Sequence, residues 1–121
     1  MPDNLRSVDR LLPLKPKVLH ILLAVADGPR HGYSIMQEVA ERTGGQVRLW
    51  PAALYGLLRE LEKLDLILES DDRPSAEEDD ERRRYFELTA LGKRVLDAEV
   101  RRLEAIVSHA RSSRALRKAR A

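Results

Sequence analysis

Apolar residues recur at helical spacing in three segments of the first half of the chain. Lys15 to Ala26 is rich in Leu, Ile and Val, and YSIMQEVAERT, which starts at Tyr33, precedes a Gly-Gly pair typical of a helix end. The third segment starts near Pro51, a residue favoured in the first turn of a helix, and repeats leucine at intervals of three and four (Leu54, Leu57, Leu58, Leu61 and Leu64). The pattern predicts three helices, with a Gly- and Pro-rich turn between the first two.

The spacing then changes to that of short strands. Residues 66–69 and 82–89 are strand candidates on either side of an acidic loop, and together they predict a β-hairpin. Alternate residues of a strand face opposite sides, so Phe86 and Leu88 are expected to complete the core while Tyr85 turns to the other face.

A long helix is predicted from Ala90 onward, with Thr89 as its N-terminal cap. Its apolar residues follow a four-three-four-three spacing, typical of a helix that packs against a partner helix. The stripe is too short for a free-standing coiled coil. We therefore expect it to pack against its own domain and against a second copy of the chain, through Leu96, Val100, Leu103 and Val107.

This order of elements predicts a fold that is mainly α with a small β-hairpin: a winged helix-turn-helix plus a C-terminal dimerisation helix. The expected divisions are an N-terminal arm (1–13), the winged helix-turn-helix DNA-binding domain (14–89), the dimerisation helix (90–110) and a basic flexible tail (111–121). A chain of 121 residues is long enough for one compact domain and one extra helix.

Charge is balanced overall and uneven locally. The 22 basic and 20 acidic residues give a net charge of only +2, which says little about partners. The stretch from Glu69 to Glu81 nevertheless holds eight acids, three arginines follow it, and the tail after Ala110 has five basic residues and no acid. The distribution favours a basic wing stem below an acidic wing tip.

Cysteine is absent, which removes disulfides and thiolate chemistry and fits a reducing cytoplasm. No apolar run approaches the roughly 18 residues that a membrane span requires. We expect a cytoplasmic protein that does not enter the membrane.

The third predicted helix has a second face with no evident use in the core. Rotation by about 100° per residue points Ala52, Tyr55, Gly56, Arg59 and Lys63 outward when the leucines face inward. Small residues at its start allow close approach to the DNA major groove, and basic residues further along can donate to bases or phosphates. The alternative is that these are ordinary solvated charges, balanced by neighbouring glutamates.

Three segments together resemble the PadR-type family of bacterial transcriptional regulators: HGYSIMQEVAERTGG, PAALYGLLRELEKLDLI and RRRYFELTALGKRVL. The resemblance covers about Leu12 to Leu103. It implies a homodimeric winged-helix protein, usually a repressor, that binds a near-palindromic operator in double-stranded DNA. Tyr33 and Tyr55 match family tyrosines at the DNA backbone, and the arginines match basic residues of the wing. The expected DNA-binding residues are Tyr33, Ala52, Tyr55, Arg59, Lys63, Arg82, Arg83 and Arg84.

Two positions depart from the family pattern. Relatives commonly have Pro-Gly-Thr-Leu-Tyr where this chain has Pro-Ala-Ala-Leu-Tyr from Pro51, so a threonine hydroxyl that could meet phosphate is lost. Relatives often have a small residue at the position of Trp50. Its ring could cover the core, lie near DNA or line an effector pocket, and packing is favoured because a lone Trp is usually buried.

Other function classes have less support. The three histidines are scattered and no phosphate-binding loop is present, so no catalytic residue, metal ligand or cofactor is expected. A winged-helix module that binds protein rather than DNA is the main alternative, and the acidic wing tip is its best argument. The resemblance also allows relief of repression by a small aromatic effector.

Overall fold

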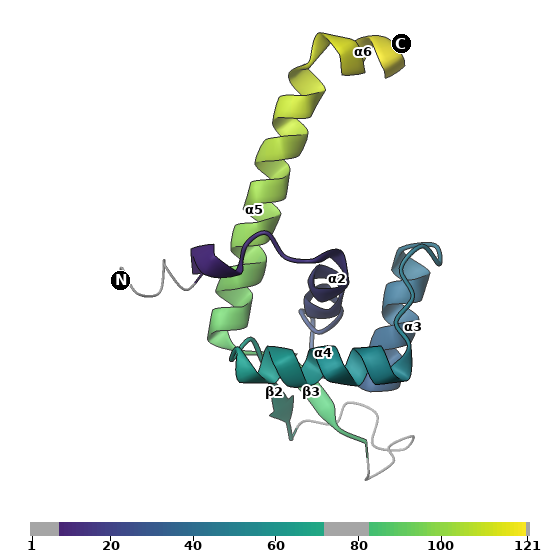
Figure 1. Ribbon diagram of the computed structural model, residues 1–121, viewed down its shortest axis with the longest axis vertical. Coiled ribbons are helices and arrows are strands. Elements are labelled where there is room, and N and C mark those ends of the chain that lie inside the picture. The colour runs from purple at the N-terminus through teal and green to yellow at the C-terminus, as the bar shows by residue number, and fades with distance from the viewer. Residues whose placement is uncertain (1–7, 72–82, 121) are drawn as a thin grey trace.

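The computed structural model describes residues 8–71 and 83–120, and these form one helical body from which a single long helix projects (Figure 1). The elements in chain order are α2 (Pro16–Ala24), β1 (Arg30–His31), α3 (Gly32–Arg42), α4 (Pro51–Lys63), β2 (Ile67–Ser70), β3 (Tyr85–Leu88), α5 (Ala90–Ser112) and α6 (Arg114–Arg120). The fold is mainly helical with a small antiparallel sheet, which confirms the predicted winged helix-turn-helix.

The sheet has three strands in the order β1-β3-β2, one more than the predicted hairpin. The extra strand lies where the sequence predicted only a turn, and it pairs His31 with Tyr85. On the other side of β3, Glu69 of β2 pairs with Phe86. Tyr85 lies outside the core cluster that contains Phe86 and Leu88, and it is nevertheless buried, next to β1, which the sequence did not predict.

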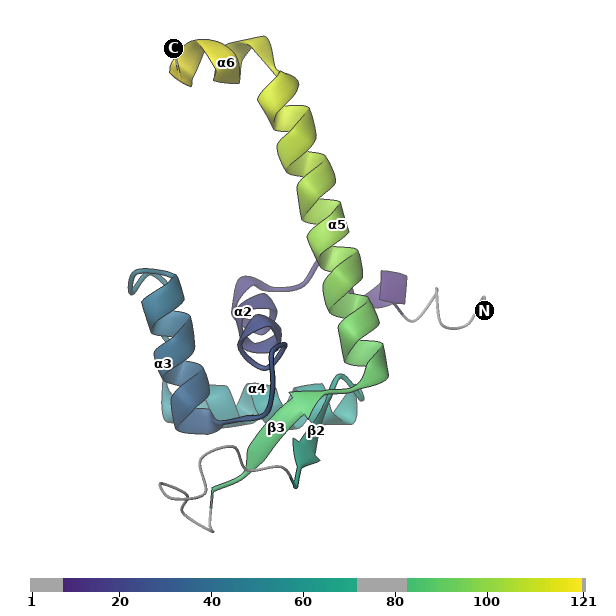
Figure 2. The ribbon, with the colours of Figure 1, turned by 180° about the vertical axis from the view of Figure 1, so that it is seen from behind.

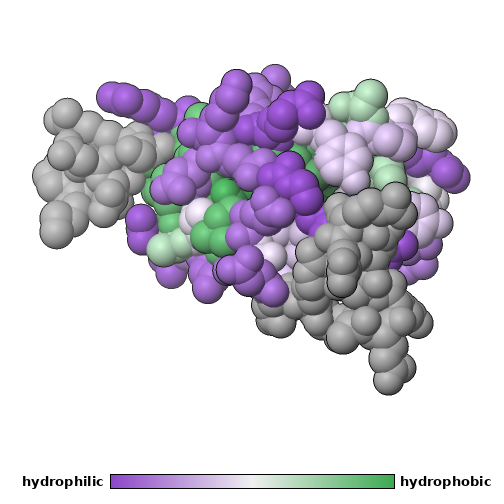
Figure 3. Space-filling model, turned by 90° about the horizontal axis from the view of Figure 1, so that it is seen from below, coloured by the Kyte–Doolittle hydropathy of each residue, from purple (hydrophilic) through white to green (hydrophobic). Residues whose placement is uncertain are grey.

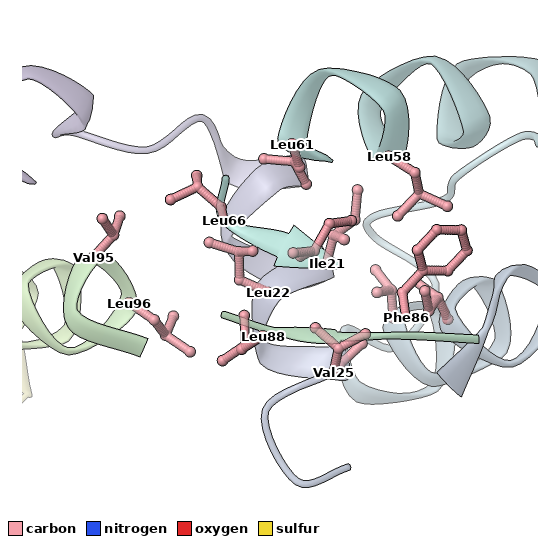
Figure 4. Close-up of a cluster of buried hydrophobic side chains, with 14 of the residues drawn as sticks. Ile21, Leu22, Val25, Leu58, Leu61, Leu66, Phe86, Leu88, Val95 and Leu96 are labelled. Carbon is pink, nitrogen blue, oxygen red and sulfur yellow. The ribbon is translucent and has the colours of Figure 1, made fainter. Parts of the chain in front are cut away.

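The core is mainly aliphatic. Phe86 is fully buried among leucines, isoleucines and valines that come from α2, α3, α4, the sheet and the start of α5 (Figure 4). The leucine stripe of α4 supplies Leu54, Leu58 and Leu61 to it. Leu64 does not take part, because the helix ends at Lys63 and the side chain of Leu64 is 45% exposed.

The junction between the sheet and α5 explains the motif Leu-Thr-x-x-Gly. The hydroxyl oxygen of Thr89 accepts a hydrogen bond from the Gly92 backbone N–H at 2.9 Å, which confirms the predicted cap. The same hydroxyl donates to the carbonyl oxygen of Asp65 at 2.6 Å. A Cβ atom at Gly92 would collide with the Leu66 carbonyl oxygen, so only glycine lets α5 lie this close to the end of α4.

The beginning of α5 belongs to the core of its own domain. Leu96 is buried there beside Leu88 (Figure 4), so this residue of the predicted stripe packs against its own domain. The carboxylate of Glu99 is also buried, where it accepts a hydrogen bond from the Leu14 backbone N–H at 2.7 Å and pairs with Arg102. Arg102 chiefly, with Leu14 adding to it, holds the pKa of Glu99 below its usual range despite burial.

Both ends of the described chain contain helical residues. Residues 8–11 are helical, and Val8 is buried in the core, so this part of the predicted arm packs on the domain. At the other end α5 continues to Ser112, and residues 114–120 form α6 within the predicted basic tail. No residue of α6 is buried, and α5 and α6 extend away from the body (Figures 1 and 2).

Candidate nucleic-acid interface

The outward face of α4 is the centre of the candidate interface. Ala52, Tyr55, Arg59 and Lys63 are all exposed, as the helical rotation predicted. Their helix lies across the end of the body opposite to the projecting α5 (Figure 1). Seen from that end, hydrophilic residues cover most of the surface and apolar residues show between them (Figure 3). A helix that is buried along one side and exposed along the other can enter a groove without disturbing the core.

Two motif elements that are far apart in the sequence meet at the N-terminal end of α3. A Cβ atom at Gly32 would lie 2.5 Å from the Tyr55 hydroxyl oxygen, so the missing side chain makes room for the tyrosine ring. Tyr55 remains 40% exposed, and Tyr33, the next residue of α3, is 56% exposed. The His-Gly-Tyr and Leu-Tyr elements therefore place two tyrosines on the surface and fix the approach of α3 to α4.

The start of α3 adds polar groups that the sequence did not predict as part of this surface. His31 caps the helix by accepting a hydrogen bond from the Ser34 backbone N–H at its Nδ1 atom, at 3.2 Å. Arg30 donates to the Ser34 hydroxyl at 3.0 Å and lies 3.8 Å from a carboxylate oxygen of Glu38. Histidine is an uncommon N-cap residue, and His31 is followed by a glycine, so the sequence predicted a turn here instead of a capped helix start.

The two described arginines of the wing differ in their surroundings. Arg83 is exposed, and its Nη1 atom lies 3.3 Å from Nε2 of His31. Arg84 pairs with Glu69 at 3.1 Å and with Glu62 at 3.3 Å, and its guanidinium lies over the Phe86 ring. The hydrogen bond to Glu69 is the main reason that the pKa of Arg84 is raised.

These contacts distinguish Arg83 from Arg84 as candidates for a phosphate contact. Arg84 ties the sheet to the end of α4, and two carboxylates already balance its charge, so Arg83 is better placed than Arg84 to meet a phosphate. Arg82 and most of the acidic wing tip lie outside the described residues.

Trp50 does not pack in the core, contrary to the sequence interpretation. It is the N-cap residue of α4, and 67% of its surface is exposed. It directly precedes Pro51, the first residue of α4.

Other kinds of site find little support in the part of the chain that the structure describes. Residues 8–71 and 83–120 contain no group of three His, Asp or Glu side chains that could hold a metal ion. None of the helices in these ranges is long and apolar enough to cross a membrane. His20 is partly buried, and burial, followed by the charge of Arg42, lowers its pKa.

Comparison with known proteins agrees with this geometry. Residues 18–98 match the family model described as the transcriptional regulator PadR-like family. The chain belongs to the PadR-like family. Members of this family are DNA-binding transcriptional regulators and not enzymes, which confirms the resemblance and the expectation that the protein is not an enzyme.

Two relatives in sequence are themselves uncharacterised. A 37.1 kDa protein in transposon TN4556 of Streptomyces fradiae is 40% identical over 79 residues, which are 65% of this chain and 20% of that protein. Protein X of Lysinibacillus sphaericus is 33% identical over 81 residues, 67% of this chain and 72% of its own length. The PadR-like chain thus spans about a fifth of the Streptomyces protein and most of the Lysinibacillus one.

Solved structures share the fold. A PadR family transcription regulator from Clostridium difficile has a TM-score of 0.64 at 24% identity, over 78% of this chain and 93% of that one. The complex hsRosR-S4, of RosR from H. salinarum, has a TM-score of 0.62 at 25% identity, over 93% and 87% of the two chains. The match to the RosR structure extends over more of this chain than the family model does.

Proposed function

We propose that this PadR-like regulator is a homodimeric repressor that binds a near-palindromic operator and releases it when a small molecule binds. The observation that carries the proposal is the single surface formed by the outward face of α4, the exposed Tyr33 and Tyr55, and Arg83 on the wing stem. On this surface α4 can enter the major groove while the tyrosine hydroxyls and the wing arginine meet phosphates. A protein that acts on DNA in this way is expected in the cytoplasm.

The dimer would form along α5, beyond the part that is buried in its own domain. Val100 and Leu103 are half-buried, and Val107 and Ile106 are 48% and 51% exposed. A shallow hollow of about 420 Å³ runs along this face and is lined by Val100, Leu103, Glu104, Val107, Ser108 and Arg111. A second copy of α5 would cover these apolar groups, each worth about 1.5–3 kcal/mol when fully removed from water.

The effector would bind in a depression of about 630 Å³ between the start of α2 and the loop before α4. Its apolar lining comes from Pro16, Val18, Val47 and Leu57, and Lys15, Lys17 and Arg48 stand around it. An aromatic ring with a carboxylate or phenolate matches this combination of apolar floor and cationic rim. Because Arg48 lies three residues before Pro51, a bound molecule could shift the start of α4 and so weaken DNA binding.

Selection of bound duplexes from a random pool tests the proposed function. We expect an enriched sequence with two related half-sites about one helical turn apart, roughly 34 Å, because a two-fold dimer presents two α4 helices. Enrichment of a single, non-repeated site would contradict the dimer, and no enrichment at all would contradict specific DNA binding.

Occupation of the depression can be tested on the same complex. Benzoate-type carboxylates should lower the affinity for the selected duplex more than their neutral amides do, and Arg48→Ala should reduce that difference. Equal effects of acid and amide would contradict the assignment of the cationic rim.

A further inference from the structure

Trp50 is exposed to a degree that neither packing nor capping explains. Its exposed fraction of 67% exceeds that of the other large apolar side chains in the described ranges. It occupies the N-cap of α4 with extended backbone angles, φ −95° and ψ 151°, yet it makes no side-chain capping hydrogen bond. Ser, Thr, Asp and Asn stabilise this position, whereas an indole leaves the helix N–H groups unpaired by its side chain. Trp50 therefore contributes little to the stability of the fold, and its large apolar side chain is free to contact another molecule.

The position of the Trp50 ring indicates which kind of molecule it would contact. Of the five aromatic residues, Tyr85 and Phe86 are buried, and the three exposed ones all lie at the N-cap or in the first two turns of α3 and α4. The apolar face of α5 that would pair with a second copy carries no aromatic residue. Trp50 is also absent from the lining of the depression beside α2. Its ring thus belongs to the surface where α4 would enter DNA.

The first turn of α4 suits a close approach to base edges. The residues that follow Trp50 are Pro51, Ala52 and Ala53, all exposed and without charge, and the turn contains no acid. The N-terminal residues of a recognition helix are those that contact bases in the major groove. Since the helix dipole is also positive at this end, the duplex can approach without charge repulsion.

The indole ring is large and apolar, so it would contact an apolar group in the major groove. Thymine alone presents a methyl group on the major-groove edge, and apolar side chains recognise it by contact. We propose that Trp50 contacts a thymine methyl group in each half-site and thereby selects a T·A pair at that position. The inference rests on the proposed function, namely operator binding through α4, and adds a residue that the family tyrosines and arginines do not include.

The test is a double-mutant cycle between protein and DNA. Each thymine of the selected duplex is replaced in turn by deoxyuridine, which removes only the methyl group, and the affinities of the full-length wild type and Trp50→Ala are measured. At one thymine per half-site the wild type should lose about fourfold for each methyl removed, the worth of one buried methyl group. Trp50→Ala should bind the unmodified duplex more weakly and should show no further loss at that thymine. Leu116→Ala, an exposed apolar residue on α6, serves as the control and should behave as the wild type.

The wild-type protein offers a second readout because Trp50 is its only tryptophan. Its fluorescence should change on addition of the selected duplex and saturate at the binding stoichiometry. Additive losses at every thymine, or fluorescence that stays unchanged while the duplex binds, would overturn the role of Trp50 and leave operator binding intact. If the pool yields no bound duplex, operator binding itself fails, and the role of Trp50 falls with it.

Discussion

At the scale of single residues, two glycines of the family motifs are required because other parts of the chain lie too close for a side chain, and not because a turn needs their backbone freedom. Gly32 leaves space for Tyr55, and Gly92 allows the Leu66 carbonyl to touch α5. Neither has a positive φ, so substitution acts through the space that a Cβ atom would occupy. The sequence shows these glycines clearly, but their purpose becomes visible only when distant segments are brought together.

Gly92→Ala should therefore destabilise the protein by about 1–3 kcal/mol, because the added methyl group forces α5 away from the end of α4. Gly56→Ala is the matched control, since a Cβ atom there meets only the end of the Arg59 side chain at 4.0 Å. In the interior of a helix, where the new methyl group has room, this change should stabilise by about 0.5–1 kcal/mol. Urea unfolding of both variants measures the difference, and equal effects of the two substitutions would contradict the close contact.

A buried carboxylate gives the fold a dependence on pH. The pKa of Glu99 is lowered in the folded protein, so its stabilising contribution is full above the unfolded pKa, about 4.3, and is lost as pH falls through the folded value. Glu99→Gln should cost about 1–3 kcal/mol at neutral pH, and the gap to the wild type should narrow in acid.

The control for Glu99 is Asp97→Asn, which removes an exposed ion pair with Arg101. This change should alter the free energy of unfolding by less than about 1 kcal/mol. Thermal unfolding between neutral pH and pH 3 measures both variants. A gap between Glu99→Gln and the wild type that stays constant over this range would show that the charge of Glu99 does not matter.

At the scale of elements, helices were easier to predict than strands. The leucine spacing predicted α4 correctly. It also predicted the outward face, because each residue of an α-helix is rotated by about 100° from the one before it, so the positions of the buried leucines fix which residues face outward. The strand β1 has only two residues, Arg30 and His31, and a Gly-Pro-Arg-His sequence carries no alternation to reveal it. The sequence did not predict the burial of Tyr85, because it did not predict β1, the strand that pairs with β3 at this residue. Trp50 was misjudged because average burial of tryptophan says nothing about a residue at the end of a loop.

The face of α4 predicts a division of roles between two of its residues. Arg59→Ala should relax the preference for one base position, because an arginine in the groove donates to a base edge. Tyr55→Phe should weaken binding to all duplexes by a similar factor, because only a hydroxyl bonded to phosphate is lost. Affinities for the selected duplex and for a scrambled one separate the two effects. The reverse pattern would exchange the two assignments.

At the scale of the whole molecule, the length of α5 beyond its own domain points to a second copy. Val107→Asp places a charge in the proposed dimer surface without touching the monomer core, since Val107 is half exposed. The dimer dissociation constant should rise about tenfold or more, because both copies lose apolar contact.

The matched control for dimerisation is Leu116→Asp on α6, which is exposed to a similar degree outside the α5 stripe. It should leave the dimer unchanged. Sedimentation at micromolar concentration tests both variants. A wild-type protein that is monomeric under these conditions would contradict the dimer through α5.

The salt dependence of operator affinity tests the central claim, that a dimer binds DNA through the outward face of α4. For the wild type, the logarithm of the association constant should fall steeply and linearly with the logarithm of salt concentration, because phosphate contacts release counterions. Lys63→Ala should reduce the magnitude of that slope by about 1.8, which corresponds to one phosphate contact of about 0.9 in each of two protomers. A wild-type affinity that is insensitive to salt, or a slope that Lys63→Ala leaves unchanged, would contradict the account.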